Sequence, residues 1–204
     1  ADGASGNGAG NTCITKTYSY DSLDRVISMT YKKGSEVLES YAYKYDKNSN
    51  ITQKTEINNT PKTENAKVNV TKAYTYNALG QLTKTEITDH KDGDSRQTIT
   101  YEYDKAGNRT KKVKGSSETT YTYNGLDQLL TAVTQRGGAE ESRATYTYDV
   151  NGNQLKEVNT KNHVTTMNEY DADNRLSKAT ITTATSVPSG GTEGDSGGNN
   201  VVNT

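Results

Sequence analysis

The chain has 204 residues, of which 24 are basic and 25 are acidic, so its formal net charge is -1. This balance gives no basic face of the kind that binds phosphate backbones, so no nucleic-acid partner is expected. No stretch approaches the roughly 20 apolar residues of a membrane span. A single cysteine, Cys13, excludes an internal disulfide.

Seven copies of one short phrase run along the chain, each with tyrosine followed by an acid or amide and a turn. The spacing of the second tyrosines varies between 20 and 31 residues, which is typical of stacked supersecondary units. In chain order the copies are Tyr18-Ser-Tyr20-Asp21, Tyr43-Lys-Tyr45-Asp46, Tyr74-Thr-Tyr76-Asn77, Tyr101-Glu-Tyr103-Asp104, Tyr121-Thr-Tyr123-Asn124, Tyr146-Thr-Tyr148-Asp149 and the abbreviated Glu169-Tyr170-Asp171.

The copies alternate between two kinds of turn. The first kind contains leucine, as in Leu23-Asp24-Arg25, and recurs at residues 79–81 and 126–128. The second kind has a small residue followed by asparagine, and its members are Ser49-Asn50, Gly107-Asn108 and Gly152-Asn153. The structural unit can therefore be a pair of repeats.

Each repeat is predicted to be a β-hairpin. Side chains alternate along a strand, so the two tyrosines of a phrase share one face. The residues that follow are turn formers, and a second β-prone run comes after each turn, as in residues 81–88 and 153–158. No window has helical periodicity. We therefore expect an all-β fold, an antiparallel meander of about seven hairpins that spirals or forms a solenoid.

The tyrosines are expected to build an aromatic ladder in a thin interior, with each ring pair stacked on the pairs above and below. Each phenol hydroxyl needs a partner, and the nearest candidates are the following Asp or Asn and the Thr and Ser hydroxyls. Four charged residues in second strands are expected to lie opposite the rings and to face solvent: Lys84, Glu86, Lys156 and Glu157.

Composition suggests four segments. Residues 1–10 are a flexible N-terminal segment, and residues 11–183 are the repeat array. Residues 184–200 form a Gly/Ser-rich connector, and residues 201–204 have the pattern of a strand that begins a next repeat. Two strands are expected to be unpaired edges that seek partners, one beginning at Cys13 and Ile14 and the other at Val201 and Val202.

The run from Tyr101 to Arg109 has the pattern Tyr-x-Tyr-Asp-x-x-Gly-Asn-Arg, which closely resembles the YD repeat, also called the RHS repeat. Seven phased copies extend this resemblance over about residues 10–176. The family includes bacterial Rhs proteins, the B and C components of insecticidal toxin complexes, wall-associated proteins and teneurins. The resemblance implies a spiralling β-sheet that forms a hollow shell, which in toxin members encloses a cargo domain.

The chemistry-bearing residues are few. His90 lies in the acidic segment from Asp89 to Asp94, which is interpreted as a turn because Asp92-Gly93 is a common hairpin signal; calcium is the alternative. His163 is interpreted as an ordinary strand or turn residue. No nucleophile elbow is present, and two histidines leave little from which to build a triad. We expect no enzyme activity, no metal and no cofactor.

Two functions remain open. The first is a non-catalytic structural segment of a secreted or cell-surface protein, of bacterial origin, that forms a shell, stalk or filament wall. Its partners would be further repeats or copies of itself, joined head to tail, and an enclosed cargo domain. The second is an adhesin-like module that binds a glycan or a protein. The fixed phase of the tyrosines favours the first.

Overall fold

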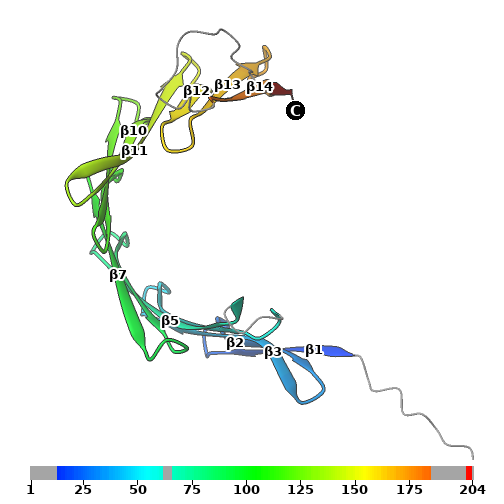
Figure 1. The fold of residues 1–204 in the computed structure, drawn as a ribbon. Helices are drawn as coiled ribbons and strands as arrows, with labels where there is room; N and C mark the ends of the chain where they lie inside the picture. The colour runs from blue at the N-terminus through cyan, green and yellow to red at the C-terminus, as the bar shows by residue number, and fades with distance from the viewer. Residues whose placement is uncertain (1–12, 62–65, 185–200, 204) are drawn as a thin grey trace, which may run out of the picture. The chain divides into compact units, whose positions relative to one another are not determined.

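The computed structural model describes residues 13–61, 66–184 and 201–203. These residues form an antiparallel meander, in which the strands follow one another in chain order (Figure 1). The predicted all-β hairpin array is thereby confirmed. The strands are β1 Ile14–Tyr20, β2 Val26–Lys33, β3 Glu36–Tyr45, β4 Ile51–Asn58, β5 Val68–Tyr76, β6 Leu82–Asp89, β7 Ser95–Tyr103, β8 Arg109–Lys114, β9 Ser117–Tyr123, β10 Leu129–Arg136, β11 Ala139–Tyr148, β12 Gln154–Asn159, β13 Val164–Tyr170, β14 Leu176–Thr183 and β15 Val201–Asn203.

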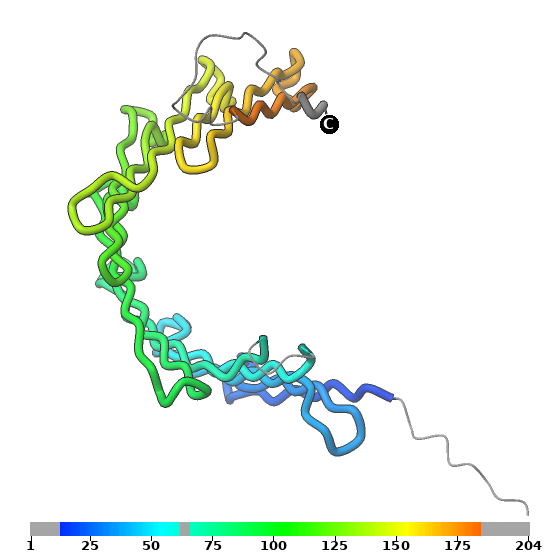
Figure 2. Tube along the Cα trace, viewed as in Figure 1, coloured from blue at the N-terminus to red at the C-terminus, as the bar shows by residue number. Residues whose placement is uncertain are grey.

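The chain divides into two units, residues 1–98 and residues 99–204. The boundary falls within β7, so the first unit holds β1 to β6 with the start of β7, and the second holds the remainder. In each unit the backbone runs back and forth between neighbouring strands (Figure 2). The expected flexible segment at residues 1–10 and most of the expected connector lie outside the described residues.

No hydrophobic side chain in the described part of the chain is fully buried. Among these described residues only Thr85 is buried, with 5% of its surface exposed. A single layer of strands leaves both faces of the sheet open. The tyrosine side chains can therefore be covered only in part, by side chains of the adjacent strands. Stability must therefore come from contacts between adjacent strands, as in other repeat arrays.

Strand register places the tyrosines on one face. Lys16 pairs with Tyr31, and Tyr31 pairs with Glu39, so Tyr31 and Tyr41 share the face of the repeat tyrosines although they lie outside the paired phrases. The expectation that Glu157 faces solvent away from the rings is wrong. Glu157 pairs with Tyr146 and shares its face, whereas Lys156 lies on the other, because adjacent strand residues point to opposite sides.

Candidate functional site

The repeat turns have one backbone geometry, whichever kind their sequence suggests. In the first, the Asp21 amide donates to the Arg25 carbonyl at 3.0 Å, and the Asp24 amide donates to the Asp21 carbonyl at 3.1 Å. The Asp21 carboxylate accepts from the amides of Leu23 and Arg25. The fourth residue has positive φ in every turn: Asp24, Ser49, Gly80, Gly107, Asp127, Gly152 and Asn174. This is a type I turn closed by a left-handed residue.

The first and fifth residues of each turn form a complementary side-chain pair. Where the first residue is aspartate, the fifth is a donor, arginine or asparagine. Where the first is asparagine, the fifth is glutamine, whose carbonyl accepts. The pairs are Arg25 Nε to Asp21 Oδ2 at 2.7 Å, Asn50 Nδ2 to Asp46 Oδ2 at 2.9 Å, Asn77 Nδ2 to Gln81 Oε1 at 2.7 Å, Asn108 Nδ2 to Asp104 Oδ2 at 3.2 Å, Asn124 Nδ2 to Gln128 Oε1 at 2.6 Å, Asn153 Nδ2 to Asp149 Oδ2 at 2.9 Å and Arg175 Nε to Asp171 Oδ2 at 2.9 Å.

These bonds lower the pKa of the turn acids. The side-chain amide of Asn50 is the largest influence that lowers the pKa of Asp46, and Asn153 acts in the same way on Asp149. For Asp171 the backbone amide of Arg175 contributes most. The ionised carboxylates therefore help to hold the turns closed.

A β-bulge follows every repeat turn. In the first hairpin Tyr20 pairs with Val26, while Ser19 pairs with Ser28, so Ile27 is an extra residue on the second strand. The same shift occurs at each second tyrosine, where the extra residues are Thr52, Thr83, Thr110, Leu130, Leu155 and Ser177.

The hydroxyl of a second tyrosine donates to the backbone carbonyl at the bulge of the preceding repeat. Sequence reasoning missed this partner, having pointed to side-chain hydroxyls, acids and amides. The bonds are Tyr45 to Val26 at 2.7 Å, Tyr76 to Ile51 at 2.8 Å, Tyr123 to Arg109 at 2.9 Å, Tyr148 to Leu129 at 2.9 Å and Tyr170 to Gln154 at 3.1 Å. Partial burial raises the pKa of Tyr76, Tyr123 and Tyr148, so these hydroxyls remain donors.

Tyrosine rings stack along a strand in two phrases, with centroids 6.3 Å apart for Tyr18 and Tyr20 and 6.5 Å apart for Tyr43 and Tyr45. The expected stacking between neighbouring repeats takes a different form in the described residues, where cations lie between rings. The Arg109 guanidinium lies 4.6 Å from the ring of Tyr121 and 5.9 Å from that of Tyr101.

The remaining first tyrosines, Tyr74 and Tyr146, also lie on this face, and partial burial raises the pKa of each. Neighbouring turns are joined as well. Arg25 Nη1 donates to the Asp46 carbonyl at 3.0 Å, and Asn108 Nδ2 donates to Asp127 Oδ1 at 2.7 Å. The turn edge is thus crosslinked from one hairpin to the next.

The residues expected to form edges lie at the ends of the strand order. Ile14 begins β1 and is 60% exposed, and Cys13 precedes it and is also exposed. Val201 and Val202 lie in β15, where they pair with Thr182 and Ile181 of β14. Their role in assembly stays a prediction.

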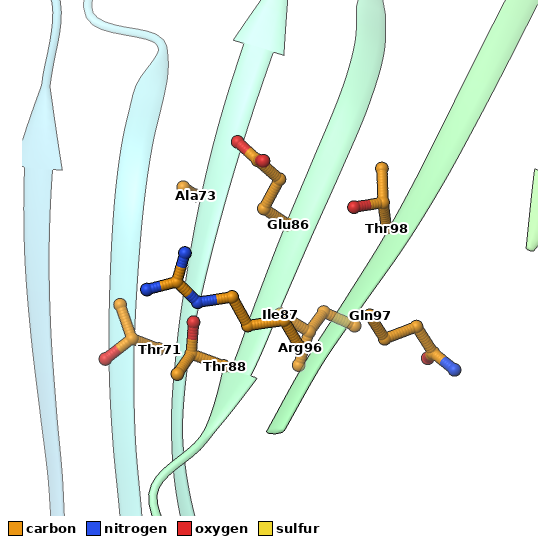
Figure 3. A pocket seen from close by; sticks show the side chains of 8 residues that line it. All are labelled: Thr71, Ala73, Glu86, Ile87, Thr88, Arg96, Gln97 and Thr98. Carbon is orange, nitrogen blue, oxygen red and sulfur yellow. The ribbon is translucent and has the colours of Figure 1, made fainter. Parts of the chain in front are cut away.

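A shallow hollow lies on the other face of the sheet, in the first unit (Figure 3). Thr71 on β5 and Thr88 on β6 are register partners there, and Arg96 and Thr98 contribute from β7. Because Thr71 alternates with Tyr74 and Tyr76 along β5, the hollow is on the face away from the rings. Its lining is mixed, with hydroxyls, the Glu86 carboxylate and the Arg96 guanidinium beside the apolar Ala73 and Ile87.

His90 lies beside this hollow, in the connector between β6 and β7. Its Nδ1 is 2.6 Å from Asp94 Oδ1, and its Nε2 is 2.9 Å from Thr71 Oγ1. Sequence reasoning treated the segment as a turn and missed this cluster, since Thr71 is 19 residues from His90 and only strand register brings them together. His163 has a positive φ of 52° in the connector between β12 and β13.

Within residues 13–61, 66–184 and 201–203, no group of three or more His, Cys, Asp or Glu side chains is placed to hold a metal ion. No helix in these segments is long and apolar enough to cross a membrane.

Comparison with known proteins gives a family match and alignments with solved structures. A family model described as Teneurin YD-shell matches residues 7–130, more than half of the chain. No curated protein matches this chain. The crystal structure of TcdB2-TccC3 aligns with TM-score 0.45 and 16% identity over 83% of this chain. This chain covers only 12% of that one. A crystal structure of a porin-like protein from Bacteroides uniformis ATCC 8492 aligns with TM-score 0.46 and 13% identity, over 93% of this chain and 88% of that one.

Proposed function

This chain belongs to the teneurin YD-shell family, and from that premise we propose that it is a structural segment of a secreted or cell-surface protein of bacterial origin. Its repeat phrases build a continuous β wall and carry no chemistry of their own. Further repeats of a parent protein, or copies of this chain, extend that wall into a shell, stalk or filament.

The bond between a second tyrosine and the bulge carbonyl of the preceding repeat carries this proposal, as in Tyr45 to Val26 at 2.7 Å. A binding protein needs its aromatic residues free at one surface, whereas these hydroxyls are used at successive repeats to join one hairpin to the next. The same phrase therefore specifies both a hairpin and its attachment, which is what a wall of many repeats requires.

The proposal extends to assembly. β1 carries seven exposed residues and pairs with β2 alone among the described strands, so its outer side offers unpaired backbone groups. Lys16 is its one charged residue. An open edge with so little charge accepts another strand readily. We propose that β1 of one copy adds to the β15 end of another in a head-to-tail contact, which propagates instead of closing. A domain enclosed by the extended wall would be its cargo.

Light scattering and electron microscopy across a concentration series test this. Elongated assemblies that grow with concentration are expected, and lysine or proline placed at residues 201–204 should suppress them. Ile14→Lys is the complementary variant, because it charges the opposite edge without touching β15. A chain that remains a compact monomer at high concentration would contradict the assembly contact, while leaving the wall role of the repeats to the stability measurements below.

One observation favours a second candidate, an adhesin-like module for a glycan or protein. The stacked rings of Tyr18 and Tyr20 are 45% and 55% exposed, which gives an aromatic platform of the kind that packs against sugar rings. Titration with oligosaccharides, followed by the intrinsic tyrosine fluorescence, distinguishes the two. Binding that Tyr18→Ala and Tyr20→Ala abolish would favour the adhesin.

A further inference from the structure

The connector between β6 and β7 carries a feature separate from the repeat phrases, and it leads beyond the proposed structural role. Asp94, His90 and Thr71 form an unbroken series of an acid, an imidazole and a hydroxyl, with contacts of 2.6 and 2.9 Å. An ionised carboxylate can only accept, so the His90 Nδ1 carries the proton that bonds to Asp94. In the neutral ring Nε2 is then an acceptor, and the Thr71 hydroxyl donates to it.

Backbone structure holds each member in place. The His90 amide donates to the Asn69 carbonyl at 2.9 Å, which ties the connector to β5 two residues before Thr71. Asp94 closes the connector with a positive φ of 61°. Thr55 Oγ1 lies 3.3 Å from Thr71 Oγ1, on the neighbouring strand. Thr55 can donate to the oxygen whose own proton is directed at His90, so the direction of the Thr71 hydroxyl is set from both sides.

Thr71 lies on an open face of the sheet. Thr71 lines the hollow on the face away from the rings, and the Arg96 side chain extends from β7 toward Thr88 and Thr71 (Figure 3). The Arg96 side chain has no hydrogen-bond or ion-pair partner within the described segments. Its guanidinium is thus a positive charge on the same face of the sheet as Thr71 that no carboxylate neutralises, and such a charge stabilises an oxyanion that forms nearby.

We propose that Thr71 is a nucleophile for small activated acyl esters. His90 is its general base, and Arg96 is the cation that stabilises the negative charge developing on the acyl oxygen. Asp94 is a positioning residue, which holds the His90 tautomer. The Thr71 oxygen bonds to the acyl carbon as its proton passes to His90 Nε2. The ester C–O bond then breaks, the leaving alcohol takes that proton, and an acyl-Thr71 ester remains. Water attacks this ester with His90 again as base, which releases the acid and restores Thr71.

The site is open to water, with 36% of the His90 side chain and 66% of the Asp94 side chain exposed. Solvent screens the acid and competes for the imidazole, so the rate enhancement belongs at the lower end of what a positioned base supplies. We expect about 10²-fold between the wild type and a variant without the base.

The test uses the full chain with p-nitrophenyl acetate, following p-nitrophenolate release and mapping the acetyl group by peptide mass spectrometry. We expect acetyl on Thr71, with release about 10²-fold slower in His90→Gln and abolished acetylation at this position in Thr71→Val. Thr71→Ser should retain the reaction, because it keeps the hydroxyl and removes the crowding methyl group. Asp94→Asn should lower the maximal rate without changing the ester concentration at half-saturation.

His163→Asn is the matched control, since it removes the other histidine at a position whose positive φ asparagine accepts. It should react like the wild type. Thermal melts of every variant separate a lost reaction from a lost fold. The proposal is overturned if His90→Gln, still folded, reacts as fast as the wild type, or if acetyl is found on lysine and tyrosine and not on Thr71. If the cluster only stabilises the connector, the variants of Thr71, His90 and Asp94 would have lower melting temperatures. The wild type would then give no acetyl-Thr71.

Discussion

The Tyr45 hydroxyl donates to the backbone carbonyl of Val26 at 2.7 Å, and this bond joins the second repeat to the first. Val26 pairs with Tyr20 at the point where the bulge interrupts the ladder. A bulge disturbs the regular exchange of backbone bonds, so it exposes a carbonyl that needs a donor. The phenol of the next repeat supplies that donor. The bulge and the tyrosine are therefore two halves of one joint.

Tyr45→Phe tests the joint. The variant keeps the ring beneath the Arg25 guanidinium, 4.7 Å away, and removes only the hydroxyl. We expect the free energy of unfolding to fall by about 1 kcal/mol, the usual net contribution of one hydrogen bond. Urea denaturation measures it. Tyr20→Phe is the matched control, since Tyr20 occupies the same repeat position but its hydroxyl has no partner within the described residues. Equal effects in the two variants would contradict the joint.

The complementary turn pairs predict a rescue. Asp46→Asn places two amides opposite each other at residues 46 and 50, and removes the carboxylate that accepts from the Asn50 side chain at 2.9 Å. We expect a lower melting temperature. Adding Asn50→Gln should recover much of the loss, because it recreates the Asn-Gln pair found at Asn77 and Gln81. Thermal melts of the two single variants and the double variant give the coupling. If the losses of melting temperature simply add in the double variant, the first and fifth turn residues do not interact.

Backbone conformation at the turns predicts different outcomes for two glycines. A Cβ at either Gly80 or Gly125 would meet open space, but Gly80 has a φ of 76° and Gly125 does not lie in the left-handed region. Gly80→Ala should therefore cost about 1 to 2 kcal/mol. Gly125→Ala should be neutral or stabilise by up to about 1 kcal/mol through the unfolded chain. Urea denaturation of both variants checks the difference, which similar values would refute.

The turn acids predict a loss of stability in acid. The pKa values of Asp46, Asp149 and Asp171 are lowered in the folded chain. A carboxyl group with a lowered folded pKa stabilises the fold above its unfolded pKa of about 3.9, and that contribution disappears as pH falls through the folded value. The melting temperature should thus be level near neutral pH and drop below about pH 4. The double variant Asp46→Asn, Asn50→Gln should show a shallower drop, because it has one fewer titrating turn. An identical acid profile would assign the loss to other carboxyl groups.

Calcium should have no effect on stability. The segment from Asp89 to Asp94 is acidic, but the Asp94 carboxylate is directed at His90 and no group of three suitable ligands occurs in the described residues. A bound ion would raise the melting temperature in proportion to the logarithm of its concentration. Melts with added calcium and with a chelator should coincide.

The repeat pattern was sufficient to predict the hairpins, their order and the face of the tyrosines, because each of these depends on residues close together in sequence. The phenol partners could not be predicted in this way. They are backbone carbonyls, which have no sequence signature, and a register shift of one residue makes them available. The bulge residues include Ile27, Thr52 and Leu130, which share no side-chain property that would indicate the shift.

The cluster at His90 shows the same limit for chemistry. The turn residues around Asp92 and Gly93 predicted a connector. The contact between His90 and Thr71, however, depends on the register of β5 and β6 and on where β6 ends. Connector lengths vary from repeat to repeat, so periodicity gives no information about side chains that meet across them. Only the register of one particular hairpin places a hydroxyl beside this imidazole.

The joint between Tyr45 and Val26 also bears on how such a chain could change in length over evolution. The second repeat, for example, offers its bulge carbonyl at Ile51 to Tyr76 of the next repeat and its own phenol, Tyr45, to the repeat before it. Recombination that removes or duplicates a whole hairpin therefore leaves no orphaned partner, since the new neighbours meet through identical groups. A globular domain with an enclosed core has no such freedom, because excising one element opens a cavity. The number of repeats in this architecture can therefore change during evolution while the hydrogen bonds between neighbouring repeats stay the same.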